Sequence, residues 1–188
     1  MADAEALSAP APSWKPGDRR DDLAAMIRVD HAGEYGATRI YAGQLAVLGA
    51  NHPKAPLIRH MAAQEAEHLS TFEGLIRSHG VRPTLLHPFW NVAGYALGAA
   101  TALVGPKMAM ACTAAVETEI DKHYAEQLEM LGDSDPELSA TIRRFQAEEL
   151  EHKATAIEHG AEEAAAYPVT SALIRLGCRV AIALSKRI

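Results

Sequence analysis

The chain has 188 residues, a formal net charge of −6 and 48% hydrophobic residues. This length suits a single domain with a substantial core, and the negative charge without a basic run argues against nucleic acid as the main partner. The two cysteines, Cys112 and Cys178, lie in apolar surroundings without disulfide or metal-ligand spacing. We therefore interpret both as small buried hydrophobic residues.

Four long helices are expected from apolar residues that recur at spacings of three or four. Residues 1–20 precede these helices and are rich in proline, which indicates a flexible leader. They lack the apolar core of a signal peptide. We expect residues 21–188 to form a single domain. Glycine and proline residues at the expected ends place the helices at 21–49, 53–80, 106–132 and from Pro136 onward.

Two additional helices are expected, an apolar one at about 88–104 and an amphipathic one at about 168–187. The most apolar stretch, 92–104, is shorter than the roughly 20 residues that a membrane-spanning helix needs. The sequence therefore predicts no transmembrane helix.

The chain repeats itself. The pattern E-x6-Y-x2-QL-x2-LG occurs at 34–49 and again at 117–132, and QEAEHLST at 64–71 resembles EELEHKAT at 148–155. A weaker similarity relates the Leu-Gly pairs at 97–98 and 176–177. These repeats predict an all-α fold in which a duplicated helical hairpin forms a pseudo-two-fold four-helix bundle, with one additional helix for each half.

Acidic residues lie within the apolar stripes of all four long helices, where they would be buried. Four converging carboxylates without counter-charge would be strongly destabilising, and two divalent cations would balance them. A glutamate from each of two helices and Glu-x-x-His from each of the other two is the ligand set of carboxylate-bridged di-metal bundles. The expected ligands are Glu34, Glu65, His68, Glu117, Glu149 and His152.

Within this set, Glu65 and Glu149 are the expected bridging ligands, while Glu34 and Glu117 would be terminal ligands. Carboxylate-rich ligation with one imidazole for each ion favours iron or manganese over zinc, and we prefer iron. Open positions would remain for dioxygen. No serine or cysteine nucleophile with its base is evident, which favours hydroxylation over hydrolysis.

Neighbouring polar residues have competing interpretations. A single Glu-x-x-His is usually a solvated helix surface, but its duplication beside matched glutamates reverses that preference. Glu67 and Glu151 are interpreted as surface charges, and the repeat selects Glu149 over Glu148 as the ligand. His31 is interpreted as an ordinary surface histidine. Tyr41 and Tyr124 are interpreted first as core residues, and a redox role or a hydrogen bond to the ligands is the weaker alternative. His123 and Asp30 are weaker candidates for such hydrogen bonds.

The remaining segments are strongly apolar. Residues 85–115 exceed what a bundle crossover requires, and residues 169–188 form an amphipathic helix that carries Arg175, Arg179, Lys186 and Arg187. The two segments either pack on each other and on the bundle or also form a platform at a membrane surface. The second interpretation would supply the metal site with an apolar substrate from the bilayer.

Several long blocks resemble the demethoxyubiquinone hydroxylase family. Besides QEAEH and EELEH, they are RVDHAGEYGATRIYAGQLAVLG (28–49), RPTLLHPFWNVAGYALGAATALVG (82–105), AMACTAAVE (109–117) and GCRVAIALS (177–185). The resemblance implies a ferritin-like fold, a di-iron centre at the six residues named above, and monooxygenation of a polyprenyl methoxy-benzoquinol with dioxygen. The implied reductant is NADH or the quinol itself.

The resemblance also implies a peripheral protein on the cytoplasmic face of a bacterial inner membrane, and it raises the prospect of a lipid-binding partner protein. Two classes of alternative stay open. One is a ferroxidase or a manganese catalase built on the same bundle. The other is a metal-binding scaffold of a quinone-biosynthesis complex without turnover of its own.

Overall fold

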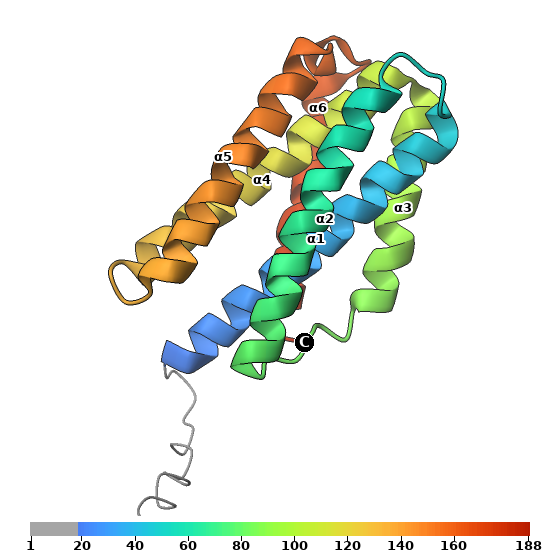
Figure 1. Ribbon diagram of the computed structural model, residues 1–188. Coiled ribbons are helices and arrows are strands. Elements are labelled where there is room, and N and C mark those ends of the chain that lie inside the picture. Colours follow the sequence, from blue (N-terminus) through green and yellow to red (C-terminus); the bar gives the residue numbers. More distant parts are fainter. Residues whose placement is uncertain (1–18) are drawn as a thin grey trace, which may run out of the picture.

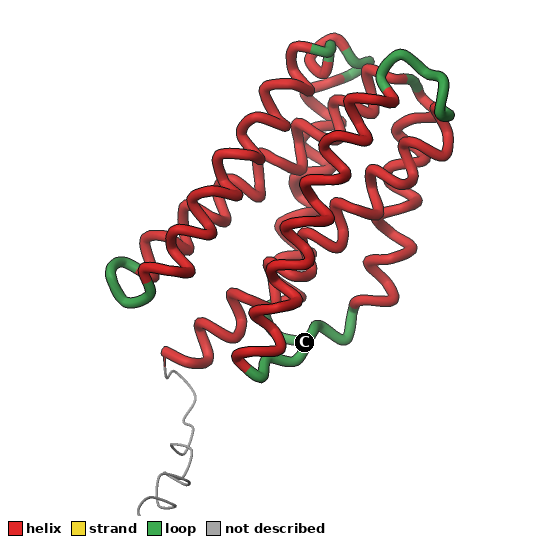
Figure 2. Tube along the Cα trace, viewed as in Figure 1, coloured by secondary structure: helices red, strands yellow, loops and turns green. Residues whose placement is uncertain are grey.

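The computed structural model describes residues 19–188, which form α-helices, one short 3₁₀ turn and no strand (Figures 1 and 2). The predicted leader therefore lies outside the described residues, apart from its last two positions. The elements are α1 (Arg19–Leu48), α2 (Ala55–His79), α3 (His87–Val104), α4 (Pro106–Leu131), α5 (Pro136–Glu158), the 3₁₀ turn Ala161–Glu163, and α6 (Tyr167–Ser185).

Proline and glycine residues set the helix ends, as the sequence predicts. Pro106 and Pro136 open α4 and α5, where a proline costs no helical hydrogen bond. The Asp135 side chain also accepts a hydrogen bond of 3.0 Å from the Leu138 backbone N–H. Gly80 ends α2 with φ of 63°, a left-handed conformation that glycine adopts without strain.

The long helices form two hairpins, α1 with α2 and α4 with α5. The backbones of α2 and α5 make little direct contact, and Figure 1 shows their ribbons apart. Side-chain contacts connect these two helices. The additional helices follow the repeat, because α3 packs on α1 and α6 packs on α4. The prediction of an all-α bundle with two additional helices is confirmed.

The two additional helices differ in how closely they pack. A Cβ atom added to Gly98 of α3 would overlap the backbone of Ile40, and one added to Gly43 of α1 would overlap the backbone of Tyr95. The equivalent Gly177 of α6 has nothing within 4 Å of such an atom. Helix α3 is therefore in backbone contact with α1, while α6 leaves open space at the equivalent glycine.

Ion pairs hold α6 to α4. Glu119 is buried on α4 and accepts a hydrogen bond of 2.6 Å from Arg175 Nε, and Arg179 lies 3.5 Å from the same carboxylate oxygen. Burial opposes ionisation of Glu119, but Arg175, Lys122 and Arg179 together outweigh it and lower the pKa of this carboxyl. These ion pairs add to the apolar contact that buried Ile174 makes with Ala115 and Val116 of α4.

Among the described helices, α6 alone is long and apolar enough by composition to cross a membrane, and 11% of its apolar window is buried. This differs from the sequence prediction, which found no helix of that kind. The prediction considered residues 92–104 and treated 168–187 as amphipathic because of its basic residues. Only Arg175 and Arg179 are charged within Tyr167–Ser185, so the helix is still apolar enough in composition to cross a membrane.

Candidate metal centre

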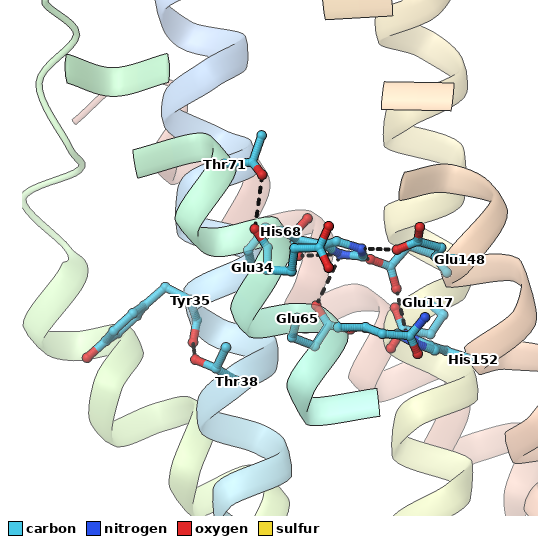
Figure 3. A network of polar contacts seen from close by, with 12 residues as sticks. Glu34, Tyr35, Thr38, Glu65, His68, Thr71, Glu117, Glu148 and His152 are labelled. Atoms are coloured by element: carbon cyan, nitrogen blue, oxygen red, sulfur yellow. Dashed lines mark hydrogen bonds and ion pairs between the residues drawn. The ribbon is translucent and has the colours of Figure 1, made fainter. Parts of the chain in front are cut away.

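The predicted ligands converge at mid-height in the bundle, between two apolar clusters. On α2, Glu65 and His68 lie between Met61 of one cluster and Phe72 of the other. All six predicted ligands are at most 2% exposed. Figure 3 shows the labelled members pointing toward one another from different helices. Burial therefore follows from their positions within the apolar stripes of four helices.

The ligand atoms form two overlapping groups, in each of which the atoms lie within 4.8 Å of one another. His68 Nδ1 lies 3.3 Å from a Glu34 oxygen and 3.1 Å from a Glu149 oxygen. His152 Nδ1 lies 3.1 Å from both Glu65 and Glu149. The two groups are Glu34, Glu65, His68 and Glu149, and Glu65, Glu117, Glu149 and His152.

Glu65 and Glu149 belong to both groups, which is the arrangement expected of ligands shared by two ions. Among the described residues, the counter-charges of the four glutamates are imidazoles, without a lysine or arginine. Several buried atoms of the cluster have no hydrogen-bond partner: Glu34 Oε2, both oxygens of Glu65, His68 Nδ1, Glu117 Oε2 and Glu149 Oε1. Buried polar atoms are normally satisfied, so this cluster fits metal ions.

The electrostatics lead to the same conclusion. Burial raises the pKa of Glu34, and burial with repulsion from Glu149 raises the pKa values of Glu65 and Glu117 well above the usual range. Burial also acts against ionisation of Glu149, but the adjacent imidazoles of His152 and His68 together outweigh it and lower its pKa to about 2. Without cations the cluster keeps only part of its negative charge, and divalent cations would permit full ionisation.

Two buried tyrosines link the halves. Tyr41 on α1 donates a hydrogen bond of 3.1 Å to Glu117 on α4, and Tyr124 on α4 donates one to Glu34 on α1. Each hydroxyl therefore orients the glutamate of the opposite half. Burial, together with the charge of that glutamate, raises the pKa of each phenol well above its usual value. Both hydroxyls stay protonated and act as donors.

A cavity of about 440 Å³ lies beside this centre, between α1, α3, α4 and α6. Its walls are almost entirely aliphatic or aromatic. Gly33 and Val116 line it, and these residues immediately precede Glu34 and Glu117. One wall of the cavity is therefore formed by the same helix turns that carry two of the glutamates.

Comparison with known proteins assigns the family. The family model described as "Ubiquinone biosynthesis protein COQ7" matches residues 21–185. The chain belongs to the COQ7 family. It is 53% identical to the 3-demethoxyubiquinol 3-hydroxylase of Rhodospirillum rubrum, in an alignment that covers 87% of this chain and 77% of the relative. It is 52% identical to the NADPH-dependent 3-demethoxyubiquinone 3-hydroxylase of Bos taurus, with 90% and 79% covered.

The structure of this COQ7-family chain adds two residues that the sequence interpretation missed. Glu148 Oε2 lies 2.6 Å from His68 Nε2, and Gln64 Oε1 lies 3.0 Å from His152 Nε2 (Figure 3 shows Glu148). In the sequence, Glu148 stands out only as a rival to Glu149 for the ligand position. Its position in the repeat, matched by Gln64, was the available signal, but the contact crosses between hairpins and depends on the fold.

Asp30 and His123, two of the weaker candidates, lie together in a second buried group. Asp30 accepts a hydrogen bond of 2.6 Å from Gln127 and lies 3.4 Å from His123 Nε2. Neither has a hydrogen bond to the predicted ligands in the described structure. Burial raises the pKa of Asp30, although His123 and Gln127 partly offset this effect.

Two expectations about single residues are wrong. His31 is 6% exposed rather than on the surface, because His87 at the start of α3 stacks on it with ring centroids 5.4 Å apart. Cys178 is partly exposed and lines the cavity, whereas Cys112 is buried as expected. Burial raises the pKa of both thiols to about 12. By contrast, Glu67 is 63% exposed, as expected of a surface charge.

Proposed function

We propose that this chain is a di-iron monooxygenase that hydroxylates a polyprenyl methoxy-benzoquinol in ubiquinone biosynthesis. The observation that carries the proposal is the buried double ligand group, with a large apolar cavity lined by the residues that precede two of its glutamates. The names of the relatives supply the substrate class. The ligands would be Glu34, Glu65, His68, Glu117, Glu149 and His152, with Glu65 and Glu149 shared between the ions.

Two iron ions held there would supply activation of dioxygen for insertion into the ring. In the overall reaction one oxygen atom replaces a ring hydrogen as a hydroxyl group, and the other leaves as water after uptake of two electrons and two protons. Carboxylate and imidazole donors suit iron. The Bos taurus relative is named as NADPH-dependent, so a reduced nicotinamide nucleotide is the first electron donor to test, followed by the quinol itself.

The protein's own residues would position the substrate and keep the site dry. The cavity walls, including Ile40, Val116 and Leu97, favour an apolar ring and the first part of an isoprenoid tail. Tyr41 and Tyr124 orient Glu117 and Glu34 through their hydrogen bonds. The aliphatic walls also exclude water, which strengthens electrostatic interactions at the centre.

We also propose that α3 and α6 face a membrane and that the protein is peripheral on the cytoplasmic side of a bacterial inner membrane. Both helices line the cavity and both carry exposed apolar side chains. These are Phe89, Val92, Leu103 and Val104 on α3, and Val169, Leu173, Leu176, Val180 and Leu184 on α6. An apolar surface of this kind, beside basic residues, is typical of interfacial helices.

Reconstitution tests the reaction. Purified protein loaded anaerobically with ferrous iron is given demethoxyubiquinol, dioxygen and NADPH or NADH, and the hydroxylated quinol is measured by mass spectrometry. We expect one product for each dioxygen consumed, and none from Glu149→Ala at matched protein concentration. Catalase or ferroxidase turnover without hydroxylated product would instead support the rival bundle enzymes. In cells, equal rescue of a deletion strain by Glu149→Ala would indicate a scaffold.

A further inference from the structure

The two imidazoles of the centre are held differently on their outer sides. In each ring Nδ1 faces the buried carboxylates, and Nε2 faces the opposite hairpin. His68 on α2 meets the carboxylate of Glu148 on α5 at 2.6 Å. His152 on α5 meets the amide oxygen of Gln64 on α2 at 3.0 Å. Equivalent histidines therefore have partners of different charge.

Gln64 and Glu148 occupy the same position of the repeat. Each immediately precedes a glutamate shared by both ligand groups, and each reaches across to the histidine of the other hairpin. Side chains at this position thus bridge α2 and α5 where their backbones lie apart. The ligand residues themselves are identical in the two halves, so this pair is a difference in the immediate surroundings of the two imidazoles.

The difference has a direct effect on the ring nitrogens. Amide and carboxylate oxygens accept hydrogen bonds, so each contact places the ring hydrogen on Nε2 and leaves Nδ1 free to bind a cation. A charged acceptor forms a hydrogen bond about twice as strong as a neutral one, and such a partner raises the basicity of a metal-binding imidazole. His68 is therefore the stronger donor of the two.

Glu148 is itself held in place. Arg144 Nη1 lies 3.7 Å from Glu148 Oε1 and donates a hydrogen bond of 2.9 Å to Glu67 on α2. Glu148 is 24% exposed, so it stands at the edge of the buried centre and its other oxygen is free to face His68. The bridge from α5 to α2 thus fixes the carboxylate on the outer face of one imidazole.

We propose that Glu148 and Gln64 are positioning residues that make the two cation positions unequal. The position built on His68 binds its divalent cation first and more tightly than the position built on His152. This inference rests on the proposed di-metal function and goes beyond it, because it assigns an order of loading to two ligand groups of the same composition.

The test is an anaerobic calorimetric titration, in which ferrous iron is added to the metal-free protein and the heat of each binding step is measured. Repulsion between two cations weakens the second step in any such site, so the decisive readout is which histidine the first step needs. In the native background, we expect His152→Ala to leave the first dissociation constant within about twofold of its native value. His68→Ala should raise it at least about tenfold.

The exchange variant Glu148→Gln with Gln64→Glu keeps both composition and net charge. In that background we expect the dependence to reverse, so that the first step now requires His152 and not His68. The matched single control is Glu151→Gln, an exposed residue of the same helix, which removes the same charge as Glu148→Gln. We expect Glu148→Gln to weaken the first step about tenfold and Glu151→Gln to leave it unchanged.

The possible results distinguish failure of the unequal cation positions from failure of the di-metal proposal. Two ions with equal dependence on His68 and His152 in both backgrounds would overturn the unequal positions and leave the di-metal proposal standing. Native protein that binds fewer than two ions would overturn both. Far-ultraviolet circular dichroism of every variant shows whether it remains helical, and Glu148→Asp, which retains the carboxylate, should restore most of the affinity lost in Glu148→Gln.

Discussion

Helices α3 and α6 occupy equivalent places in the two halves, yet they make opposite kinds of contact. Gly98 of α3 lies directly on the backbone of α1, whereas Gly177 of α6 has open space where a side chain would be. The aliphatic cavity lies between α6 and the packed pair of α1 and α3, with α4 as a further wall. The glycine of a repeated Leu-Gly pair therefore makes a tight helix contact in one half and lines the cavity in the other.

The polar residues around the centre show a similar divergence. Gln44 and Gln127 are equivalent in the repeat, and each reaches across to the other long helix of the α1–α4 pair. Gln127 donates to Asp30 at 2.6 Å, while Gln44 donates to the Ala109 carbonyl at 3.1 Å and lies 3.5 Å from Thr113. Duplication preserved the ligands and allowed the supporting contacts to separate into an acidic and a neutral version.

The largest expected effect distinguishes the two glycines. Gly98→Ala would drive a methyl group into the Ile40 backbone, so we expect it to lower the free energy of unfolding by about 3 kcal/mol. Gly177→Ala meets nothing and should raise it by about 0.5–1 kcal/mol, because alanine favours a helix. Urea unfolding of the metal-free proteins measures both. Equal losses in the two variants would contradict the difference in packing.

A larger side chain at Gly177 should hinder binding of the substrate in the cavity. Gly177→Phe fills part of the cavity without touching the α1–α3 contact. We expect kcat/KM for the quinol to fall about 100-fold, or about 2.7 kcal/mol. Binding of ferrous iron should be unchanged, because Gly177 belongs to neither ligand group.

Steady-state kinetics and iron titration of the same preparation check the Gly177→Phe prediction. The control is Gly74→Phe on α2, where a Cβ also meets nothing within 4 Å and which lies outside the cavity lining. Undiminished turnover in the Gly177 variant would show that substrate does not use this cavity.

The contacts of Gln127 and Gln44 should contribute differently to the free energy of unfolding. Asp30→Ala removes the carboxylate that accepts from buried Gln127 and lies 3.4 Å from His123, and we expect a loss of about 2 kcal/mol. Thr113→Ala removes only a 3.5 Å contact of Gln44, which retains the Ala109 carbonyl, so about 0.5 kcal/mol is expected. Thermal unfolding at neutral pH measures the difference. A larger loss at Thr113 would reverse the comparison.

The smallest expected effect concerns the outer surface of α6. Leu176 and Val180 are about half exposed and are not part of the cavity lining. Changing both to serine should reduce partitioning onto anionic lipid vesicles about tenfold, since about 1.4 kcal/mol of apolar contact is lost. Vesicle co-sedimentation measures this. Met130→Ser, at an exposed apolar residue of α4, is the control and should bind vesicles like the native chain.

The sequence was sufficient for the fold because two independent signals agree in it. Apolar spacing locates the long helices, and the repeat shows which glutamates correspond, which brings Glu34 and Glu117 into one cluster with the Glu-x-x-His pairs. Side-chain contacts between neighbouring helices could not be predicted from these two signals. Glu148 reaches His68 only because α2 and α5 are the right distance apart, and His31 is buried only because α3 begins over it.

The cavity was beyond sequence reasoning for a related reason. Its volume depends on how far α6 stands from α1 and α4, and spacing along one helix carries no information about that separation. The apolar character of 85–115 and 169–188 indicated that a hydrophobic substrate was plausible. It could not show that Gly33 and Val116 form a wall one residue from two of the glutamates.

The attachment of α6 through Glu119 divides the molecule into a fixed part and an adjustable part. The bundle and α3 are joined by close backbone packing, so the ion-binding geometry tolerates little change there. Helix α6 is fastened to α4 by Arg175 and Arg179 and by buried Ile174, and much of its remaining inner face, including Gly177, lines the cavity. Natural variation along that single face could therefore accommodate different ring substituents or tails while the oxygen chemistry stays the same.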